Sequence, residues 1–95
     1  MKYRIMGRSG LKVSALSMGT FSFGGRGPFA AIASQSVTEA ARLIDCCTDH
    51  GVNLIDTANM YSTGLSEEIV GEVLADRNPD ILISSKARMR IGDGP

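Results

Sequence analysis

The chain has 95 residues, of which 43% are apolar and 21% are charged, a balance typical of one globular domain. Ten basic and ten acidic side chains cancel, so the positive excess of a nucleic-acid-binding or membrane-surface protein is absent from the composition. The sequence opens on a mixed segment without an apolar leader, and no apolar run approaches the roughly 20 residues of a membrane span. Cys46 and Cys47 are adjacent, which fits neither a disulfide framework nor a zinc site, so we expect reduced cysteines in a cytoplasmic protein.

The first part of the chain predicts short extended segments. Residues 2–6 and 11–13 flank the turn signal of residues 7–10, which contains two glycines and indicates a β-hairpin. Residues 15–18 lead into Gly19 and fit another short strand. Residues 20–35 hold several glycines and a proline, which predicts a long loop of the kind that often carries function.

A helix is expected to begin after Ser36. Ser36 and Glu39 have the spacing of a capping box, and apolar residues follow at helical intervals. Gly51 supplies a left-handed C-terminal cap, and His50 lies in the last turn, where a cation suits the helix dipole.

The remaining pattern alternates strands and helices. Residues 52–56 form a short apolar run that suits a buried parallel strand, and residues 81–83 form another. Between them Ser66 is expected to cap a second helix that ends near Ala75, before the break at Pro79. Residues 87–95 are expected to be a loop. A helix between successive strands is the signature of parallel β/α units, so we predict one α/β domain over residues 1–95.

Three ionisable residues follow the predicted strands. Asp56 ends one strand, Tyr61 follows five residues later, and Lys86 lies at the end of the next strand. In a parallel barrel such positions face the catalytic mouth, and sequential strands are commonly neighbours. We therefore expect Asp56 and Lys86 to lie side by side.

This combination has a chemical use. A tyrosine hydroxyl, with an ordinary pKa of about 10, is a poor acid near neutrality, and a nearby ammonium stabilises the phenolate. A carboxylate beside Lys86 would keep its ammonium charged, and Tyr61 would then protonate a carbonyl oxygen as hydride reaches the carbon. Each residue also has a plainer interpretation: a loop cap for Asp56, a packing aromatic for Tyr61, and a surface lysine for Lys86.

Linked motifs along the whole chain resemble the aldo-keto reductases. Residues 7–14 (GRSGLKVS) and 18–21 (MGTF) resemble the opening of that family. Residues 51–61 (GVNLIDTANMY) resemble its signature, and residues 64–71 (GLSEEIVG) match the segment that follows. Residues 83–86 (ISSK) resemble the strand with the family lysine, and residues 92–95 (GDGP) resemble the aryl-alcohol-type and potassium-channel-β-like branch.

The resemblance implies a (β/α)8 TIM barrel, of which this chain would hold the hairpin, three strands and two helices. It implies NADPH-dependent reduction of an aldehyde or ketone. Tyr61 would be the general acid, and Lys86 and Asp56 would tune it. Gly19, Thr20 and Phe21 match the loop beside the nicotinamide, and Asp56 also lies near the cofactor ribose in the family. No metal is implied.

The resemblance also indicates what this chain lacks. The family's catalytic histidine belongs after a fourth strand, whereas the only histidine here is His50, on the first predicted helix. Asn59, Ser62 and Phe21 replace residues that are more frequent in the family, namely an acid, a glycine, and Trp or Met. We expect a truncated barrel that is inactive alone and self-associates through its sheet edges. The alternatives are a binding or regulatory module and a non-functional remnant.

Overall fold

The computed structural model describes residues 1–25, 29–31, 33–90 and 92. Its elements in chain order are β1 (Tyr3–Ile5), β2 (Lys12–Ser14), β3 (Met18–Gly19), α1 (Val37–Asp49), β4 (Leu54–Asp56), the 3-10 turn η2 (Tyr61–Gly64), α2 (Leu65–Leu74) and β5 (Leu82–Ser84). Most of the loop predicted over residues 20–35 is described. Much of the predicted Gly-Asp-Gly-Pro loop lies outside the described residues.

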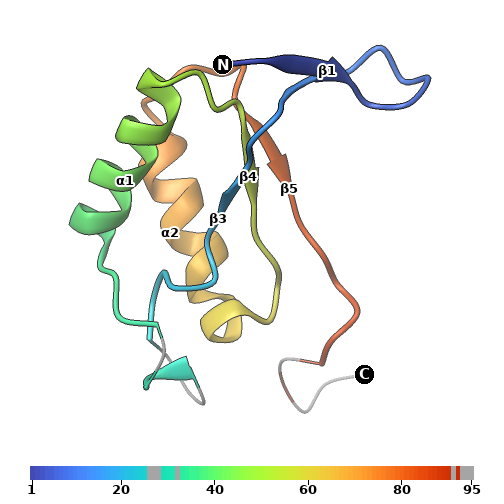
Figure 1. The fold of residues 1–95 in the computed structure, drawn as a ribbon. Coiled ribbons are helices and arrows are strands. Elements are labelled where there is room, and N and C mark those ends of the chain that lie inside the picture. The colour runs from blue at the N-terminus through green and yellow to red at the C-terminus, as the bar shows by residue number, and fades with distance from the viewer. Residues whose placement is uncertain (26–28, 32, 91, 93–95) are drawn as a thin grey trace.

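Two separate sheets form, as the sequence pattern predicts. β1 and β2 pair antiparallel as a hairpin, with Arg4 opposite Val13. β3, β4 and β5 form a parallel sheet in sequential order, in which Gly19 is registered with Asp56 and Asp56 with Ser84. Figure 1 shows the hairpin at one end of the parallel sheet, opposite the end to which the strands run. This confirms the prediction of parallel β/α units preceded by a hairpin.

Both helices cover the same face of the parallel sheet (Figure 1). The apolar side chains that α1, α2 and β4 turn toward one another form the core with Phe23 from the loop after β3. The buried members of this core are Phe23, Ala40, Ile44, Ile55, Ile69, Val70 and Val73. Removing such surface from water is the main favourable contribution to folding. None of the helices in the described part of the chain is long and apolar enough to span a membrane.

The ends of α1 agree with the caps expected from the sequence. Ser36 Oγ accepts a hydrogen bond from the Glu39 amide at 3.4 Å. At the other end Gly51 has φ +91°, and the amides of Gly51 and Val52 donate to the carbonyls of Thr48 and Cys47. This is the Schellman pattern, which satisfies carbonyls that the helix leaves open. His50 occupies the C-cap position, where its Nδ1 lies 2.7 Å from the Cys46 carbonyl oxygen.

The start of α2 differs from the prediction. Gly64 (φ +102°) is the N-cap, so the helix begins at Leu65 and not after Ser66. Ser66 lies inside the first turn, is fully buried, and donates to the backbone oxygen of Thr20 at 2.8 Å. Its hydroxyl therefore ties the helix to the loop after β3 and leaves the helix end uncapped by a side chain.

Asn53 joins the hairpin to the parallel sheet. Its Oδ1 accepts from the Ser14 amide at 2.8 Å, and its Nδ2 donates to the Lys12 carbonyl at 3.0 Å. The Ser14 hydroxyl in turn accepts from the Asn53 amide at 3.1 Å. Tyr3 adds a bond from its hydroxyl to the Gly51 carbonyl at 2.7 Å. These bonds fix the hairpin against the amino end of β4.

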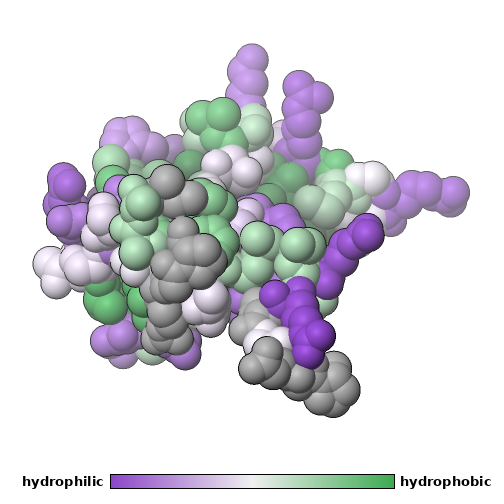
Figure 2. Space-filling model, turned by 90° about the horizontal axis from the view of Figure 1, so that it is seen from below, coloured by the Kyte–Doolittle hydropathy of each residue, from purple (hydrophilic) through white to green (hydrophobic). Residues whose placement is uncertain are grey.

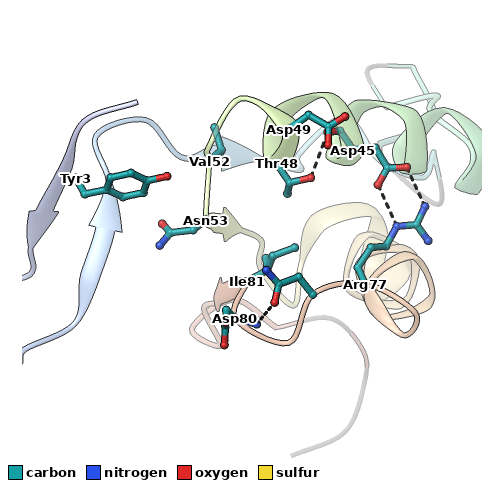
Figure 3. Close-up of a pocket in the computed structure, with 10 residues that line it drawn as sticks. Tyr3, Asp45, Thr48, Asp49, Val52, Asn53, Arg77, Asp80 and Ile81 are labelled. Atoms are coloured by element: carbon teal, nitrogen blue, oxygen red, sulfur yellow. Dashed lines mark hydrogen bonds and ion pairs between the residues drawn. The ribbon is translucent and has the colours of Figure 1, made fainter.

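A hollow of about 440 Å³ lies at this hairpin end of the molecule (Figure 3). Tyr3 and Asn53 lie on one side of it, and the ion pair between Arg77 and Asp45 lies on the other. The pair is bidentate, with Arg77 Nε 3.1 Å from Asp45 Oδ1 and Nη2 3.0 Å from Oδ2. It links α1 to the segment after α2, so we interpret this end of the molecule as structural.

Candidate active site

The predicted catalytic residues meet at the other end of the parallel sheet, where the strands end. Asp56 is the last residue of β4, Tyr61 opens η2, and Lys86 follows β5 by two residues. Figure 2 views the molecule from this end, where hydrophobic side chains lie near the middle and hydrophilic side chains project at the rim. Lys86 Nζ lies 2.7 Å from Asp56 Oδ2, so the expected proximity of these two residues is observed.

The Lys86 ammonium is the centre of this group. It donates to Asp56 Oδ2 at 2.7 Å and to the Thr57 carbonyl at 2.8 Å. It lies 3.4 Å from the Tyr61 hydroxyl oxygen and 5.1 Å from the centre of the Tyr61 ring. One cation thus contacts the carboxylate, the phenol and the backbone between them.

The ion pair changes the acidity of both partners. The hydrogen bond from Lys86 holds the pKa of the Asp56 carboxyl below its usual range, against the opposing effect of burial, and a bond from Ser84 Oγ at 2.8 Å adds to it. The hydrogen bond to Asp56 raises the pKa of Lys86 in turn. The Asp56 carboxylate and the Lys86 ammonium therefore each stabilise the charged form of the other.

The residues expected beside a nicotinamide surround the same point. Gly19 is registered with Asp56, and a Cβ added to it would meet no atom within 4 Å, so space is open at the sheet end. The Phe21 ring is 42% exposed and meets the Tyr61 ring edge-on, with 5.1 Å between centres. Thr20 is fully buried, and its amide and hydroxyl both donate to the Asp56 carbonyl at 3.1 Å. Open space at Gly19 and an exposed aromatic ring at Phe21 are thus both found where β3 ends, at the carboxyl end of the sheet.

A buried group of hydroxyls supports this end of the sheet and was not predicted. Ser66 Oγ lies 2.9 Å from Thr20 Oγ1 and 3.3 Å from Thr57 Oγ1. All three residues are at most 2% exposed. The group connects the ends of β3 and β4 to the first turn of α2. The sequence offers only small polar residues at separate positions here, and their meeting requires the three-dimensional arrangement.

The backbone after Tyr61 adopts a rare conformation. Ser62 (φ 48°, ψ 39°) and Thr63 (φ 52°, ψ 38°) are both left-handed, which costs a residue with a side chain about 1–2 kcal/mol. Ser62 stands where the family more often has glycine, which adopts this conformation without that cost.

Asn59, the second departure noted in the sequence, connects the loops after β4 and β5. Its backbone amide donates to the Lys86 carbonyl at 3.0 Å, and its side-chain Nδ2 donates to the Met89 carbonyl at 3.2 Å. A carboxylate at this position could not make the second bond, so the asparagine is suited to this loop.

His50 takes no part in the candidate site. It caps α1 at the hairpin end of the molecule, whereas Tyr61 and Lys86 lie beyond the opposite ends of the strands. Cys46 and Cys47 lie on α1 without a disulfide. Among the described residues there is no group of three or more histidine, cysteine, aspartate or glutamate side chains that would hold a metal ion.

A parallel β/α sheet with aspartate, tyrosine and lysine at its carboxyl end is the arrangement that the sequence resemblance predicts. The aldo/keto reductase family model matches residues 15–95, so the chain belongs to this family of oxidoreductases. It is 42% identical over 90 residues to the Arabidopsis thaliana protein named "Probable voltage-gated potassium channel subunit beta". It is 33% identical over 94 residues to "Uncharacterized oxidoreductase YqkF" of Bacillus subtilis.

Solved structures agree with this assignment. The aldo-keto reductase AKR11C1 from Bacillus halodurans, in its holo form, is 36% identical and superposes with a TM-score of 0.76 over 98% of this chain. The chain spans 28% of that structure. The match to the Arabidopsis relative includes 90% of this chain but only 25% of that protein. The match to the Bacillus subtilis relative includes 99% of this chain but 28% of that protein. The chain thus spans about a quarter of the length of the relatives it matches.

Proposed function

We propose that this chain supplies the proton-donating part of an active site that reduces an aldehyde or ketone to an alcohol with NADPH. The observation that carries the proposal is the Lys86 ammonium, which lies 2.7 Å from Asp56 Oδ2 and 3.4 Å from Tyr61 Oη. A phenol beside an ammonium that a carboxylate holds in place is suited to give a proton to a carbonyl oxygen.

In this proposal Tyr61 is the general acid. Lys86 stabilises the phenolate that remains once the proton has moved from Tyr61 Oη to the carbonyl oxygen. Asp56 keeps the ammonium charged and oriented, and the buried Thr20 fixes the backbone carbonyl of Asp56. Gly19, Thr20 and Phe21 would hold the nicotinamide, and Asp56 would approach the ribose. NADPH, when bound, supplies the hydride that the carbonyl carbon receives.

We also propose that residues 1–95 form the hairpin and the first three strands of a (β/α)8 barrel whose other strands and catalytic histidine lie outside this chain. The short share of each relative that the chain spans supports this. Among the described strands, β3 and β5 have one neighbour each, so both could pair with further strands. The isolated chain is then expected to be inactive.

A second candidate is a regulatory subunit of a potassium channel. The identity of 42% to a protein named as such a subunit favours it. The two functions predict different results for a Tyr61→Phe variant, because a purely regulatory protein does not need the Tyr61 hydroxyl.

The test is a graft in which residues 1–95 replace the corresponding part of the Bacillus halodurans reductase. The graft is expected to oxidise NADPH in the presence of an aromatic aldehyde, and the isolated chain is not. Tyr61→Phe should lower kcat by about 10²- to 10⁴-fold, the usual contribution of a general acid. Tyr3→Phe is the matched control, because that hydroxyl bonds the Gly51 carbonyl at the far end of the molecule.

A folded graft in which Tyr61→Phe turns over as fast as the unsubstituted protein would overturn the proposal. Reduction by the isolated chain would instead contradict the claim that residues outside it complete the site.

A further inference from the structure

The segment after the candidate acid is held in an unfavourable conformation. Ser62 and Thr63 both have positive φ, of 48° and 52°, directly between Tyr61 and Gly64, the N-cap of α2. Side-chain-bearing residues keep such angles only where surrounding contacts hold them, and such residues gather at functional sites. The contacts at Ser62 therefore indicate what this segment is held against.

Ser62 is held by the loop after β3. Its side chain is fully buried, and its Oγ accepts a hydrogen bond from the Gly25 amide at 2.9 Å. The backbone of Gly24 also approaches closely, since a Cβ added there would lie 2.7 Å from both Cβ and Oγ of Ser62. Ser62 thus fills the space that the missing Cβ of Gly24 leaves open, and its hydroxyl binds the amide of the next residue, Gly25.

The same loop touches Tyr61 at a second point. Phe21 meets the Tyr61 ring edge-on, with 5.1 Å between centres and 78° between planes. Between the two contact points the loop is fixed by Phe23, which is 1% exposed, and by the bond from the Gly24 amide to the Gln35 carbonyl at 2.9 Å. The loop therefore contacts the tyrosine segment through the Phe21 ring and through the Gly25–Ser62 bond.

We propose that Ser62 is a positioning residue: its hydroxyl fastens Gly25 to the tyrosine segment and so sets the Tyr61 ring against Phe21 and Lys86. The catalytic consequence rests on the proposed reductase function. Thr63 shares the backbone conformation, but its hydroxyl donates to the adjacent Ser62 carbonyl at 2.8 Å. Thr63 is therefore the natural control for the strain alone.

Three variants separate the hydrogen bond from the strain. Ser62→Ala removes the acceptor for Gly25 and keeps a side chain at positive φ. Ser62→Gly removes the acceptor and relieves the strain. Thr63→Gly relieves a similar strain and leaves the acceptor in place. If only strain mattered, the two glycine variants would behave alike and Ser62→Ala would resemble the original chain.

The first measurements use the 95-residue chain at low concentration and do not depend on activity. Amide exchange at Gly25 should become about tenfold faster in both Ser62 variants, the effect of losing one net hydrogen bond, and stay unchanged in Thr63→Gly. The chain has two tyrosines and no tryptophan, so with Tyr3→Phe the fluorescence reports Tyr61 alone. Acrylamide should quench this fluorescence more strongly in both Ser62 variants.

The catalytic measurement uses the grafted enzyme. We expect Ser62→Ala and Ser62→Gly to lower kcat by about tenfold, equivalent to one hydrogen bond, with the KM for NADPH unchanged. Thr63→Gly should keep the original kcat. A Ser62→Gly variant that gains stability and still loses kcat would separate positioning from a general loss of stability.

The outcomes distinguish the two proposals. Unchanged Gly25 exchange and Tyr61 quenching in both Ser62 variants would overturn the positioning role, and so would unchanged kcat in an active graft. A folded graft without any reductase activity would overturn the proposed function and the catalytic part of this inference with it. Amide exchange and quenching would still decide whether Ser62 holds the loop.

Discussion

At the scale of single residues, Lys86 connects Asp56 and Tyr61 in the candidate site. Its Nζ binds Asp56 and the Thr57 carbonyl and lies 3.4 Å from the Tyr61 hydroxyl, so the three side chains meet at one point. The ion pair is partly exposed, with side-chain exposures of 51% for Lys86 and 34% for Asp56. Exposed pairs contribute little to stability, which agrees with the role that we propose for this pair in the chemistry of Tyr61.

The pKa shifts of the pair predict a dependence of stability on pH. The lowered pKa of Asp56 gives a stabilisation present above the ordinary carboxyl value of about 3.9, and lost as pH falls through the folded-state value. The raised pKa of Lys86 gives a second stabilisation, which is fully present below the ordinary lysine pKa of about 10.4. This stabilisation is lost as pH rises through the folded-state pKa. Lys86→Met should weaken both dependences in urea unfolding measured across this window.

Lys2→Met serves as the control for that experiment, because Lys2 is exposed at the hairpin end, away from Asp56. If Lys86→Met and Lys2→Met give the same dependence of unfolding free energy on pH, the ion pair does not shift either pKa in solution.

At the scale of elements, local signals predicted α1 well. Ser36 and Gly51 act through their own neighbours in the chain, so their roles are visible in the sequence. The parallel order of the strands followed from the helices between them. The positions of Asp56 and Lys86 followed from the strand ends, although β1 and β4 are shorter than expected and β5 ends at Ser84.

The error at α2 has a physical cause. Ser66, followed by two glutamates, resembles an N-cap, but the left-handed residues before Gly64 turn the chain so that Gly64, two positions earlier, is the N-cap. Serine and threonine seldom adopt positive φ, so their sequence gives no sign of it. The partner of Ser66 is Thr20, 46 residues away, and the partner of Ser62 is Gly25. Such distant pairs cannot be predicted from local patterns.

Gly51 tests how α1 is joined to the hairpin, and Gly71, within α2, is the comparison. Gly51→Ala should lower the free energy of unfolding by at least about 1 kcal/mol, since Gly51 has φ +91°. The new Cβ would also lie 2.8 Å from Met1 Cβ and Tyr3 Oη. Gly71→Ala should raise it by about 0.5–1 kcal/mol, because Gly71 lies within α2 with no atom near its added Cβ. Urea denaturation measures both, and equal effects would contradict the account of the Gly51 cap.

At the scale of the whole molecule, the core lies between the helices and one face of the sheet. The helices cover β4 but leave Ile83 of β5 exposed. Ile83 is 54% exposed, whereas its registered neighbour Ile55 is 1% exposed. An apolar edge strand of this kind is a template for pairing with another chain. In a complete barrel, further strands and helices would cover β5 and Ile83.

We therefore expect the isolated chain to self-associate through β5. Ile83→Lys should shift the chain toward monomer in sedimentation equilibrium, because a charge on an edge strand opposes pairing. Ile5→Lys is the matched control, since Ile5 is 55% exposed but lies on the hairpin. A chain that is monomeric at all concentrations, or that responds equally to both substitutions, would contradict this prediction.

The most direct test of the central claim follows hydrogen from cofactor to product. The grafted enzyme is given an aromatic aldehyde and NADPH that carries deuterium at both positions of the nicotinamide C4. We predict alcohol with deuterium on the carbinol carbon, formed about 10²- to 10⁴-fold more slowly by Tyr61→Phe than by Tyr3→Phe. Deuterium absent from that carbon, or equal rates for the two variants, would contradict the assignment of Tyr61, Lys86 and Asp56 as the proton-donating part of a reductase.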